Sequence, residues 1–240
     1  MSLQQQVVKP LFDTRSGTRI IADLGKALGV GRFFDFDMEE GNQLRLKPLG
    51  VKPEELKEKG MVFVGEKWKE GFDKLQTPSG KVEIASKTLE QLGYPPIPRW
   101  EEPLVSPDPK DPSSFRLIHG KQAVHTHAMT ANQPVLMAVS HRYDMVRLWM
   151  NKARGQQLGL RDGDWVRMTS IVGDGRIRLR LTEGIHPSCV WLPSGYGVYS
   201  KHLKTAYDIG LSYNDFLPTY FDPTVGHAMS SEIVVQIKKA

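Results

Sequence analysis

Residues that could hold a phosphate-bearing ligand gather near the middle of the chain. Gly120 and Lys121 follow an apolar run, so the glycine lets backbone amides approach a ligand and the lysine supplies a positive charge suited to phosphate. The residues that follow are rich in hydrogen-bonding side chains, namely His125, His127, Thr130 and Asn132. This segment lacks helix or strand periodicity, and its donors suit a heteroaromatic cofactor or its phosphates. A polar loop with purely structural hydrogen bonds is the alternative interpretation.

A second glycine-containing segment ends an apolar run further along the chain. Pro193-Ser194-Gly195-Tyr196-Gly197 predicts an open loop in which a planar ligand could approach the backbone. Ser194 lies in no Gly-x-Ser-x-Gly elbow, and the sequence assigns none of the seven histidines to it as a base. We therefore do not expect a serine hydrolase.

Two groups of residues could bind a metal, but each lacks the further ligands that a metal site needs. His125 and His127 are spaced to share one face of a strand, but the pair has no nearby carboxylate or cysteine, which makes a poor metal site. Asp162-Gly163-Asp164 lacks the further oxygens of an EF-hand loop and is better explained as a turn between a helix and a strand. Cys189 is the only cysteine, so the chain has no internal disulfide, and its apolar neighbours predict a small buried core residue.

Composition and charge narrow the class of protein. The chain has 240 residues, of which 40% are hydrophobic, enough for a sizeable core. Its longest apolar runs are far shorter than the roughly 20 residues that cross a bilayer. The net charge is +5, with Arg176, Arg178 and Arg180 on one face of a predicted strand, which we interpret as a solvated face. No zinc-finger spacing, RNP-like block or basic recognition helix is evident, so we do not expect nucleic-acid binding.

The C-terminal half has the pattern of a β-protein. One short helix, at 152–159, interrupts a series of short apolar or alternating runs separated by Gly, Asp, Pro and Ser. These runs predict strands at 115–118, 146–150, 165–170, 176–181, 189–192 and 233–237. Such a density of strands suggests a closed barrel.

The N-terminal part predicts a mixture of short elements. Residues 18–29 form an amphipathic pattern that ends in glycine, and the apolar face of this helix needs a partner. Further elements are expected as helices at 53–60 and 86–93 and as short strands at 61–64 and 81–84. Seven prolines between residues 94 and 114 exclude a helix or a central strand and predict an extended linker at a domain boundary. Because Met1 to Leu3 and the following glutamines show no capping or hydrophobic pattern, we expect the chain to be a fragment of a longer protein.

The order of these blocks resembles a known family. The Gly-Lys turn, the His-rich stretch, Asn151-Lys152-Ala153, the segment 158–166 and Pro193 to Gly197 follow one another as in the C-terminal cofactor-binding domain of molybdopterin oxidoreductases. The segment Thr77-Pro78-Ser79-Gly80-Lys81-Val82-Glu83 is similar to one common in the same enzymes. The chain therefore resembles the dimethyl sulfoxide reductase superfamily, and most closely its thiosulfate and polysulfide reductase branch.

The resemblance implies a fold and a division into domains. Residues 115–240 would form a six-stranded double-psi β-barrel that binds molybdopterin dinucleotide, mainly β with short helices. A small α/β extension would precede it, with residues 1–94 as the tail of an upstream α/β domain and 95–114 as the proline-rich linker.

The resemblance also implies a cofactor and the residues that bind it. The cofactor would be bis-molybdopterin guanine dinucleotide with molybdenum or tungsten, while the metal ligand and an iron-sulfur cluster would lie upstream. This chain would contribute no catalytic or metal-ligating residue. Lys121 stands where many members of the family carry arginine, so a single charge would replace a bidentate contact. The expected cofactor-binding residues, with Asn132 as a brace of its loop, are Gly120, Lys121, His125, His127, Thr130, Asn132, Gly195, Tyr196 and Asn214.

The expected activity of the whole protein follows from the same resemblance. The chain would belong to a catalytic subunit that reduces thiosulfate, polysulfide or a related sulfur compound. Its electrons would come from an iron-sulfur subunit and a membrane subunit that oxidises quinol, in a complex in the periplasm or on the outer face of the cytoplasmic membrane. Two alternatives stay open: a stand-alone β-barrel that acts as a binding or adaptor module, and another member of the superfamily such as a formate dehydrogenase or nitrate reductase.

Overall fold

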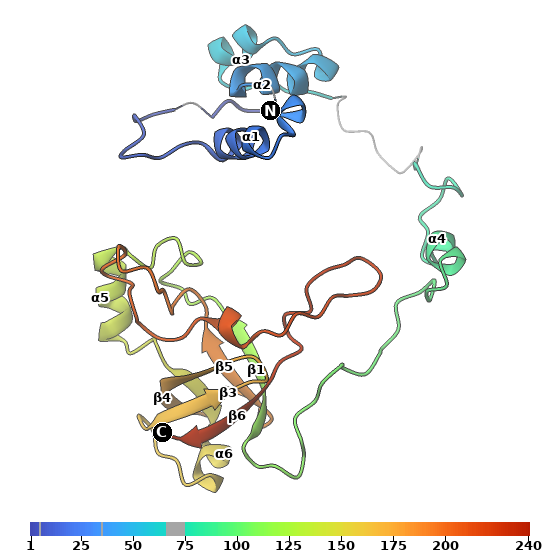
Figure 1. Cartoon of the computed structure of the whole chain (residues 1–240). Helices are drawn as coiled ribbons and strands as arrows, with labels where there is room; N and C mark the ends of the chain where they lie inside the picture. The colour runs from blue at the N-terminus through green and yellow to red at the C-terminus, as the bar shows by residue number, and fades with distance from the viewer. Residues whose placement is uncertain (5, 35, 66–74) are drawn as a thin grey trace. The chain divides into compact units, whose positions relative to one another are not determined.

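The computed structural model describes residues 1–4, 6–34, 36–65 and 75–240. The chain divides into two compact units, residues 1–83 and residues 84–240 (Figure 1). The second unit contains the expected β-barrel and is described first. The predicted domain boundaries at residues 94 and 114 stay predictions.

Six strands close into a barrel, as predicted. Around the barrel their order is β1-β5-β2-β4-β3-β6. The pairs β1/β5 and β2/β4 are parallel and all other neighbours are antiparallel. The strands span Ser114–Gly120 (β1), Leu148–Asn151 (β2), Trp165–Thr169 (β3), Asp174–Thr182 (β4), Cys189–Pro193 (β5) and Val234–Lys239 (β6). Every strand that the sequence predicts after residue 114 is therefore present.

The pairing has an internal two-fold pattern that explains how the barrel closes. Exchanging β1 with β4, β2 with β5 and β3 with β6 reproduces every strand pair and its direction. The barrel thus consists of two interlocked halves of three strands, and the prediction of a double-psi β-barrel is confirmed. Strands β1, β3 and β5 run in one direction and the other three run in the opposite direction, so the segments after β1, β3 and β5 leave the same end of the barrel.

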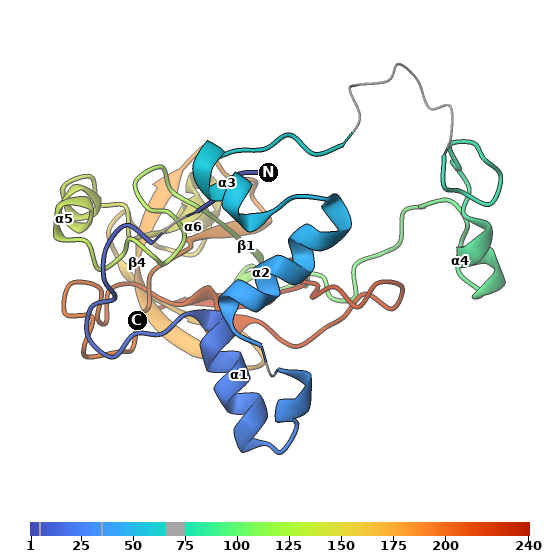
Figure 2. The same ribbon diagram turned by 90° about the horizontal axis from the view of Figure 1, so that it is seen from above.

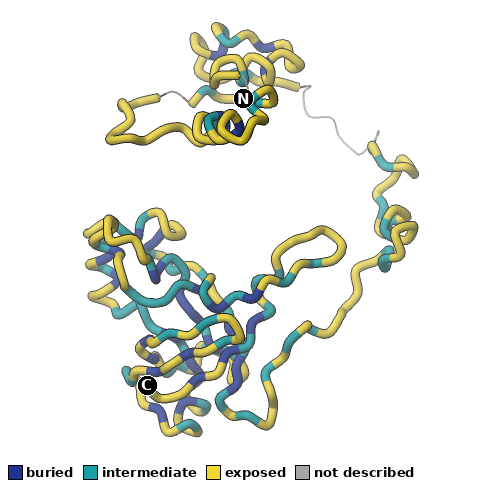
Figure 3. Tube along the Cα trace, in the orientation of Figure 1, coloured by how far each residue is buried: buried dark blue, intermediate teal, exposed yellow. Residues whose placement is uncertain are grey.

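Alternation along the strands builds the core of the barrel. In β3 every second residue is buried, and in β4 the residues at alternate positions are buried or half-buried between exposed ones, which is the pattern of a sheet with one solvated face. Figure 3 shows the buried residues concentrated in the barrel strands. Each large aliphatic side chain that is fully buried contributes about 1.5–3 kcal/mol to stability. The fully buried members include Phe115, Leu117, Leu148, Met150, Val166, Met168, Leu179, Val190, Leu192 and Phe216.

Two helices of the second unit lie at opposite ends of the barrel. Helix α6, Lys152–Gln157, follows β2 directly, and the Asn151 side-chain oxygen accepts hydrogen bonds from the backbone N–H groups of Ala153 and Arg154. Helix α5, Pro134–Arg142, lies at the other end, beside the segment that follows β5 (Figure 1). The sequence predicts α6 but not α5, although Gln133 caps α5 and Pro134 occupies its first turn, both of which are local helix-start signals.

The first unit is a small helical assembly (Figure 2). Leu46, Val51 and Leu56 form its core cluster. The predicted apolar face of α1 is present and exposed, with Ile20 and Leu24 each more than half accessible. The elements are α1 (Gly17–Ala27), η1 (Gly31–Phe33), α2 (Met38–Leu46), η2 (Lys47–Leu49) and α3 (Pro53–Lys59).

Several predictions for the region before the barrel are wrong. Residues 61–64 form no strand; Met61 makes only an isolated bridge with Ser2, because no neighbouring strand is present to extend the pairing. Residues 81–84 are likewise irregular. Helix α2 was not predicted, although Asp37 and Glu40 form a capping box at its start. The helix expected near 86–93 is confirmed as α4, Lys87–Gln91, and the proline-rich residues up to β1 contain neither helix nor strand, as expected.

Among the described residues, no helix is long and apolar enough to cross a membrane.

Candidate functional site

The two segments that carry most of the predicted site residues start side by side. Strands β1 and β5 are parallel neighbours, and their last residues, Gly120 and Pro193, are partners in register. The Ser194 N–H donates to the Gly120 carbonyl oxygen at 2.9 Å, which extends the pairing into the loops. We call residues 121–133 the first loop and residues 194–212 the second loop. Because ligands commonly bind beyond the carboxyl ends of parallel strands, this end of the barrel is the candidate site.

Close packing of the two loops requires a glycine. Gly195 has a φ of +96°, a conformation that side chains disfavour. A Cβ on Gly195 would also overlap the carbonyl oxygen of His127. Gly195 therefore lets the backbones of the two loops touch.

A buried hydrogen-bond network joins the loops to α5. His125 Nε2 lies 2.8 Å from Ser140 Oγ, and the Tyr196 hydroxyl donates to the same oxygen at 3.0 Å. His125 Nδ1 lies 3.2 Å from Thr130 Oγ1, and the rings of His125 and Tyr196 meet edge to face. The three central residues are nearly inaccessible, at 6% for His125, 0% for Ser140 and 5% for Tyr196. Two of the predicted ligand residues are thus engaged inside the protein, and Ser140 is a member that the sequence did not reveal.

Burial also affects the acidity of Tyr196. Its pKa is raised because desolvation disfavours the phenolate, an effect only partly offset by the hydrogen bond with Ser140. The phenol therefore keeps its proton at neutral pH and acts as a donor.

Asn132 joins the first loop to the second one. Its side-chain oxygen accepts from the backbone N–H groups of Thr205, at 3.0 Å, and Ala206, at 3.3 Å. Behind this contact, Ala131, Met137, Tyr196 and Ala206 form a separate apolar cluster. The geometry agrees with the expectation that Asn132 braces its loop.

Three of the predicted site residues keep their side chains exposed at this end. Lys121 and His127 are exposed on the first loop, and the backbone of His127 is left-handed, with φ +52°. Asn214 is exposed on the short helix η3, Tyr213–Phe216, which follows the second loop. These side chains are accessible to a ligand, in contrast to His125 and Tyr196.

The structure adds an aromatic pair that the sequence did not reveal. The ring of His119 stacks on the ring of Tyr213 with 3.7 Å between centroids, and this contact brings η3 against the end of β1. His119 Nδ1 lies 3.1 Å from Ser194 Oγ. Desolvation lowers the pKa of His119, so its ring is neutral at neutral pH.

The pairing of Ser194 with His119 does not form a hydrolytic triad. A serine nucleophile needs a base that a third group orients, usually a carboxylate. In the described parts of the chain, no carboxylate forms a hydrogen bond with His119. The pair instead connects the end of β1 to the second loop.

The other candidates for chemistry have structural roles. Asp162 accepts from the backbone N–H of Leu181 and Asp164 accepts from that of Arg161, which confirms the predicted turn. Within the described ranges, no group of three or more His, Cys, Asp or Glu side chains could hold a metal ion. The prediction that Cys189 is buried is wrong: its side chain is half-buried, because Cys189 is the first residue of β5, at the edge of the barrel.

The arginines of β4 point outward, as predicted. Arg176, Arg178 and Arg180 are exposed at alternate positions. Arg176 lies over the ring of Trp165 and Arg180 over that of Trp149. Stacking on neighbouring aromatic rings explains how the strand carries three like charges on one face.

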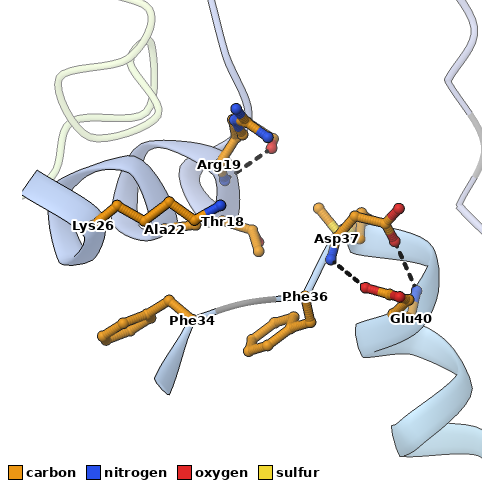
Figure 4. A pocket seen from close by; sticks show the side chains of 10 residues that line it. Thr18, Arg19, Ala22, Lys26, Phe34, Phe36, Asp37 and Glu40 are labelled. Carbon is orange, nitrogen blue, oxygen red and sulfur yellow. Dashed lines mark hydrogen bonds between the residues drawn. The ribbon is translucent and has the colours of Figure 1, made fainter. Parts of the chain in front are cut away.

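A cavity lies in the first unit. It has a volume of about 460 Å³ and lies between α1 and the start of α2 (Figure 4). Phe34 and Phe36 line it together with Arg19, and the capping box of Asp37 and Glu40 forms part of its rim. None of the predicted cofactor-binding residues lines it, so this cavity is separate from the candidate site.

The donor set at the end of the barrel suits a dinucleotide. An exposed lysine, an exposed histidine and loop hydroxyls provide donors for phosphate oxygens. The residues present therefore fit a phosphate-bearing heterocyclic cofactor.

Comparison with known proteins agrees with this interpretation. The chain is 26% identical to the thiosulfate reductase molybdopterin-containing subunit PhsA of Salmonella typhimurium. The alignment covers 94% of this chain and 32% of that protein. The acetylene hydratase of Syntrophotalea acetylenica is 30% identical over 80% of this chain and 27% of its own length. The chain thus spans about a third or less of these relatives.

A solved structure shares the fold. The acetylene hydratase from Pelobacter acetylenicus matches all of this chain and 35% of its own, with a TM-score of 0.72 and 22% identity. Residues 115–233 match the family model of the molydopterin dinucleotide binding domain. These residues include the first five strands of the barrel and the two loops described above. Over this segment the chain belongs to the molybdopterin dinucleotide-binding domain family, with homologues in the dimethyl sulfoxide reductase superfamily.

Proposed function

We propose that the chain is the cofactor-binding end of a molybdenum oxidoreductase catalytic subunit, and that the two loops hold bis-molybdopterin guanine dinucleotide. The observation that carries this proposal is the meeting of the loops beyond β1 and β5, inside the segment that matches the family. The family assignment supports the class of cofactor. The loop geometry supports the place at which it binds.

The exposed residues of the loops would make the direct contacts. Lys121 would neutralise a phosphate as a point charge, and the ring of His127 would donate to a phosphate or a pterin oxygen. Asn214 would contact the cofactor from the side of η3. The buried His125 and Tyr196 and the half-buried Asn132 would keep the loops in place.

The cofactor supplies the redox chemistry when it is bound, and this chain supplies binding and orientation. We propose a sulfur compound such as thiosulfate or polysulfide as the substrate, because the thiosulfate reductase subunit aligns over 94% of the chain. In the whole enzyme an iron-sulfur cluster upstream, an iron-sulfur subunit and a quinol-oxidising membrane subunit would deliver electrons. This arrangement would place the complex in the periplasm or on the outer face of the cytoplasmic membrane.

Charge reversal at one exposed lysine tests the proposed cofactor site. In the longer catalytic subunit, Lys121→Glu should lower the content of both molybdenum and guanine nucleotide, because it places a negative charge beside the phosphates. Lys152→Glu is the matched control, since Lys152 is also exposed but lies on α6 at the other end of the barrel. Normal contents of molybdenum and nucleotide in the Lys121 variant would refute the proposed site.

The substrate needs a separate assay. The purified subunit with its cofactor should reduce thiosulfate or polysulfide with a reduced viologen dye, and it should be compared on dimethyl sulfoxide and arsenate, compounds in the names of other relatives. Acetylene, in the name of a further relative, is followed by its disappearance, because its hydration consumes no electrons. Turnover of one of these three and not of thiosulfate or polysulfide would leave the cofactor site intact but replace the proposed substrate.

A further inference from the structure

The buried network beside the site has a direction that can be worked out from its donors and acceptors. The Tyr196 hydroxyl donates to Ser140 Oγ at 3.0 Å. A serine hydroxyl has one hydrogen, and within the described chain the other side-chain partner of Ser140 Oγ is His125 Nε2, at 2.8 Å. If Ser140 accepted from both partners, its hydrogen would be buried without an acceptor, since the side chain is inaccessible to water. Ser140 therefore donates to His125, and Nε2 of that ring is an acceptor.

An acceptor at Nε2 places the ring hydrogen on Nδ1. A neutral imidazole carries one hydrogen, so the Nδ1–H of His125 donates to Thr130 Oγ1 at 3.2 Å. The same oxygen accepts from the backbone N–H of Thr126 at 2.9 Å. Both lone pairs of Thr130 Oγ1 are then occupied, and its own hydrogen has no acceptor in the described part of the protein.

We propose that Ser140 is a positioning residue: by donating to His125 it sets the direction of the network and leaves Thr130 with a hydroxyl hydrogen that is free to bind an oxygen of the ligand. Thr130 is half-buried on the first loop. In the sequence it follows the exposed Lys121 and His127 and precedes Asn132. The ligand oxygen would be an anionic phosphate or a pterin carbonyl. This role of Thr130 rests on the proposed function, whereas the direction of the network does not.

Complete burial makes Ser140 suitable for this role. Its side chain has no access to water, so water cannot replace the hydrogen bonds that a substitution removes. Burial raises the pKa of Tyr196, so its hydroxyl keeps its proton and is able to donate at neutral pH. The network also connects three separate elements, because Ser140 lies on α5, His125 and Thr130 on the first loop and Tyr196 on the second.

The tautomer of His125 tests the direction without any cofactor. In the 240-residue chain with nitrogen-labelled histidine, long-range proton–nitrogen NMR spectra should show hydrogen on Nδ1 and a bare Nε2, with the signal assigned by its loss in His125→Asn. Ser140→Ala removes the donor to Nε2 and should move the ring toward the Nε2–H tautomer. Tyr196→Phe keeps the Ser140 donor and should leave the tautomer unchanged. A ring with hydrogen on Nε2 in the unaltered chain, or an unchanged tautomer in Ser140→Ala, would overturn the proposal.

Cofactor retention in the longer subunit tests the role of Thr130. Thr130→Val removes the hydroxyl and should lower retained molybdenum and guanine nucleotide by about tenfold. A hydrogen bond to a charged group strengthens binding by about this factor. Thr130→Ser keeps the hydroxyl and should retain both. Equal retention in the two variants would overturn the role of Thr130. If the unaltered subunit holds no cofactor, the proposed function fails, and the NMR result still decides the direction of the network.

Discussion

The backbone of Gly195 lies against the carbonyl oxygen of His127, with no room for a side chain between them. This contact joins the loop after β5 to the loop after β1, although the two residues are far apart in the sequence. The family match covers both loops, so the contact lies within the part of the chain that is assigned to dinucleotide binding.

Replacing Gly195 by alanine should destabilise the barrel unit and separate the loops. The change combines a disfavoured φ of +96° with overlap on the His127 carbonyl, and we expect a loss of at least about 2 kcal/mol in the free energy of unfolding. Urea unfolding curves of the unaltered chain and the variant measure this loss. Gly226→Ala is the matched control, since Gly226 has a φ of +67° but open space around it, and should cost only about 1–2 kcal/mol. Equal losses in the two variants would mean that the contact with His127 contributes nothing.

The brace formed by Asn132 gives a second prediction. Asn132→Ala leaves the N–H of Thr205 without its acceptor, which should cost about 1–3 kcal/mol in the free energy of unfolding, whereas the N–H of Ala206 still donates to the carbonyl oxygen of Leu203. Asn132→Asp keeps an acceptor oxygen and should recover most of this loss. Asn214→Ala removes an exposed amide and should leave the unfolding curve unchanged. A stable Asn132→Ala variant would show that the brace is not required.

Much of this arrangement could be predicted from the sequence, because the strands have strong alternating patterns and clear turn residues. The six strands and α6 follow from such local signals. Helix α5 was missed because its apolar residues follow a polar loop without a clear period, although Gln133 and Pro134 mark its start. Ser140 and His119 could not be recognised as members of the site, since their partners come from distant elements that only the fold brings together. His125 and Tyr196 are both expected as cofactor contacts, on opposite sides of the ligand, and their burial and their contact with each other depend on tertiary packing.

The stacked pair of His119 and Tyr213 predicts a dependence of stability on pH. Desolvation lowers the pKa of His119 below its usual value of 6.5, so the unfolded chain binds this proton more readily than the folded chain. The stability contributed by the neutral ring is therefore present above about pH 6.5 and is lost as the pH falls through the lower pKa of the folded state.

Unfolding at two pH values measures this effect. The free energy of unfolding from urea curves should fall more between about pH 7.5 and about pH 5.5 for the unaltered chain than for His119→Gln, which cannot titrate. The other ionisable groups are the same in both proteins, so their contributions cancel in the comparison. Parallel changes in the two proteins would contradict the assignment of a lowered pKa to His119.

Hydrogen exchange of the longer catalytic subunit, with and without its cofactor, tests the central claim most directly. The account predicts that bound cofactor slows exchange in residues 120–132 and 194–214, while α6 and the exposed face of β4 at Arg176 to Arg180 change little. Slower exchange confined to other parts of the chain, with both loops unchanged, would contradict it and would require a different binding surface.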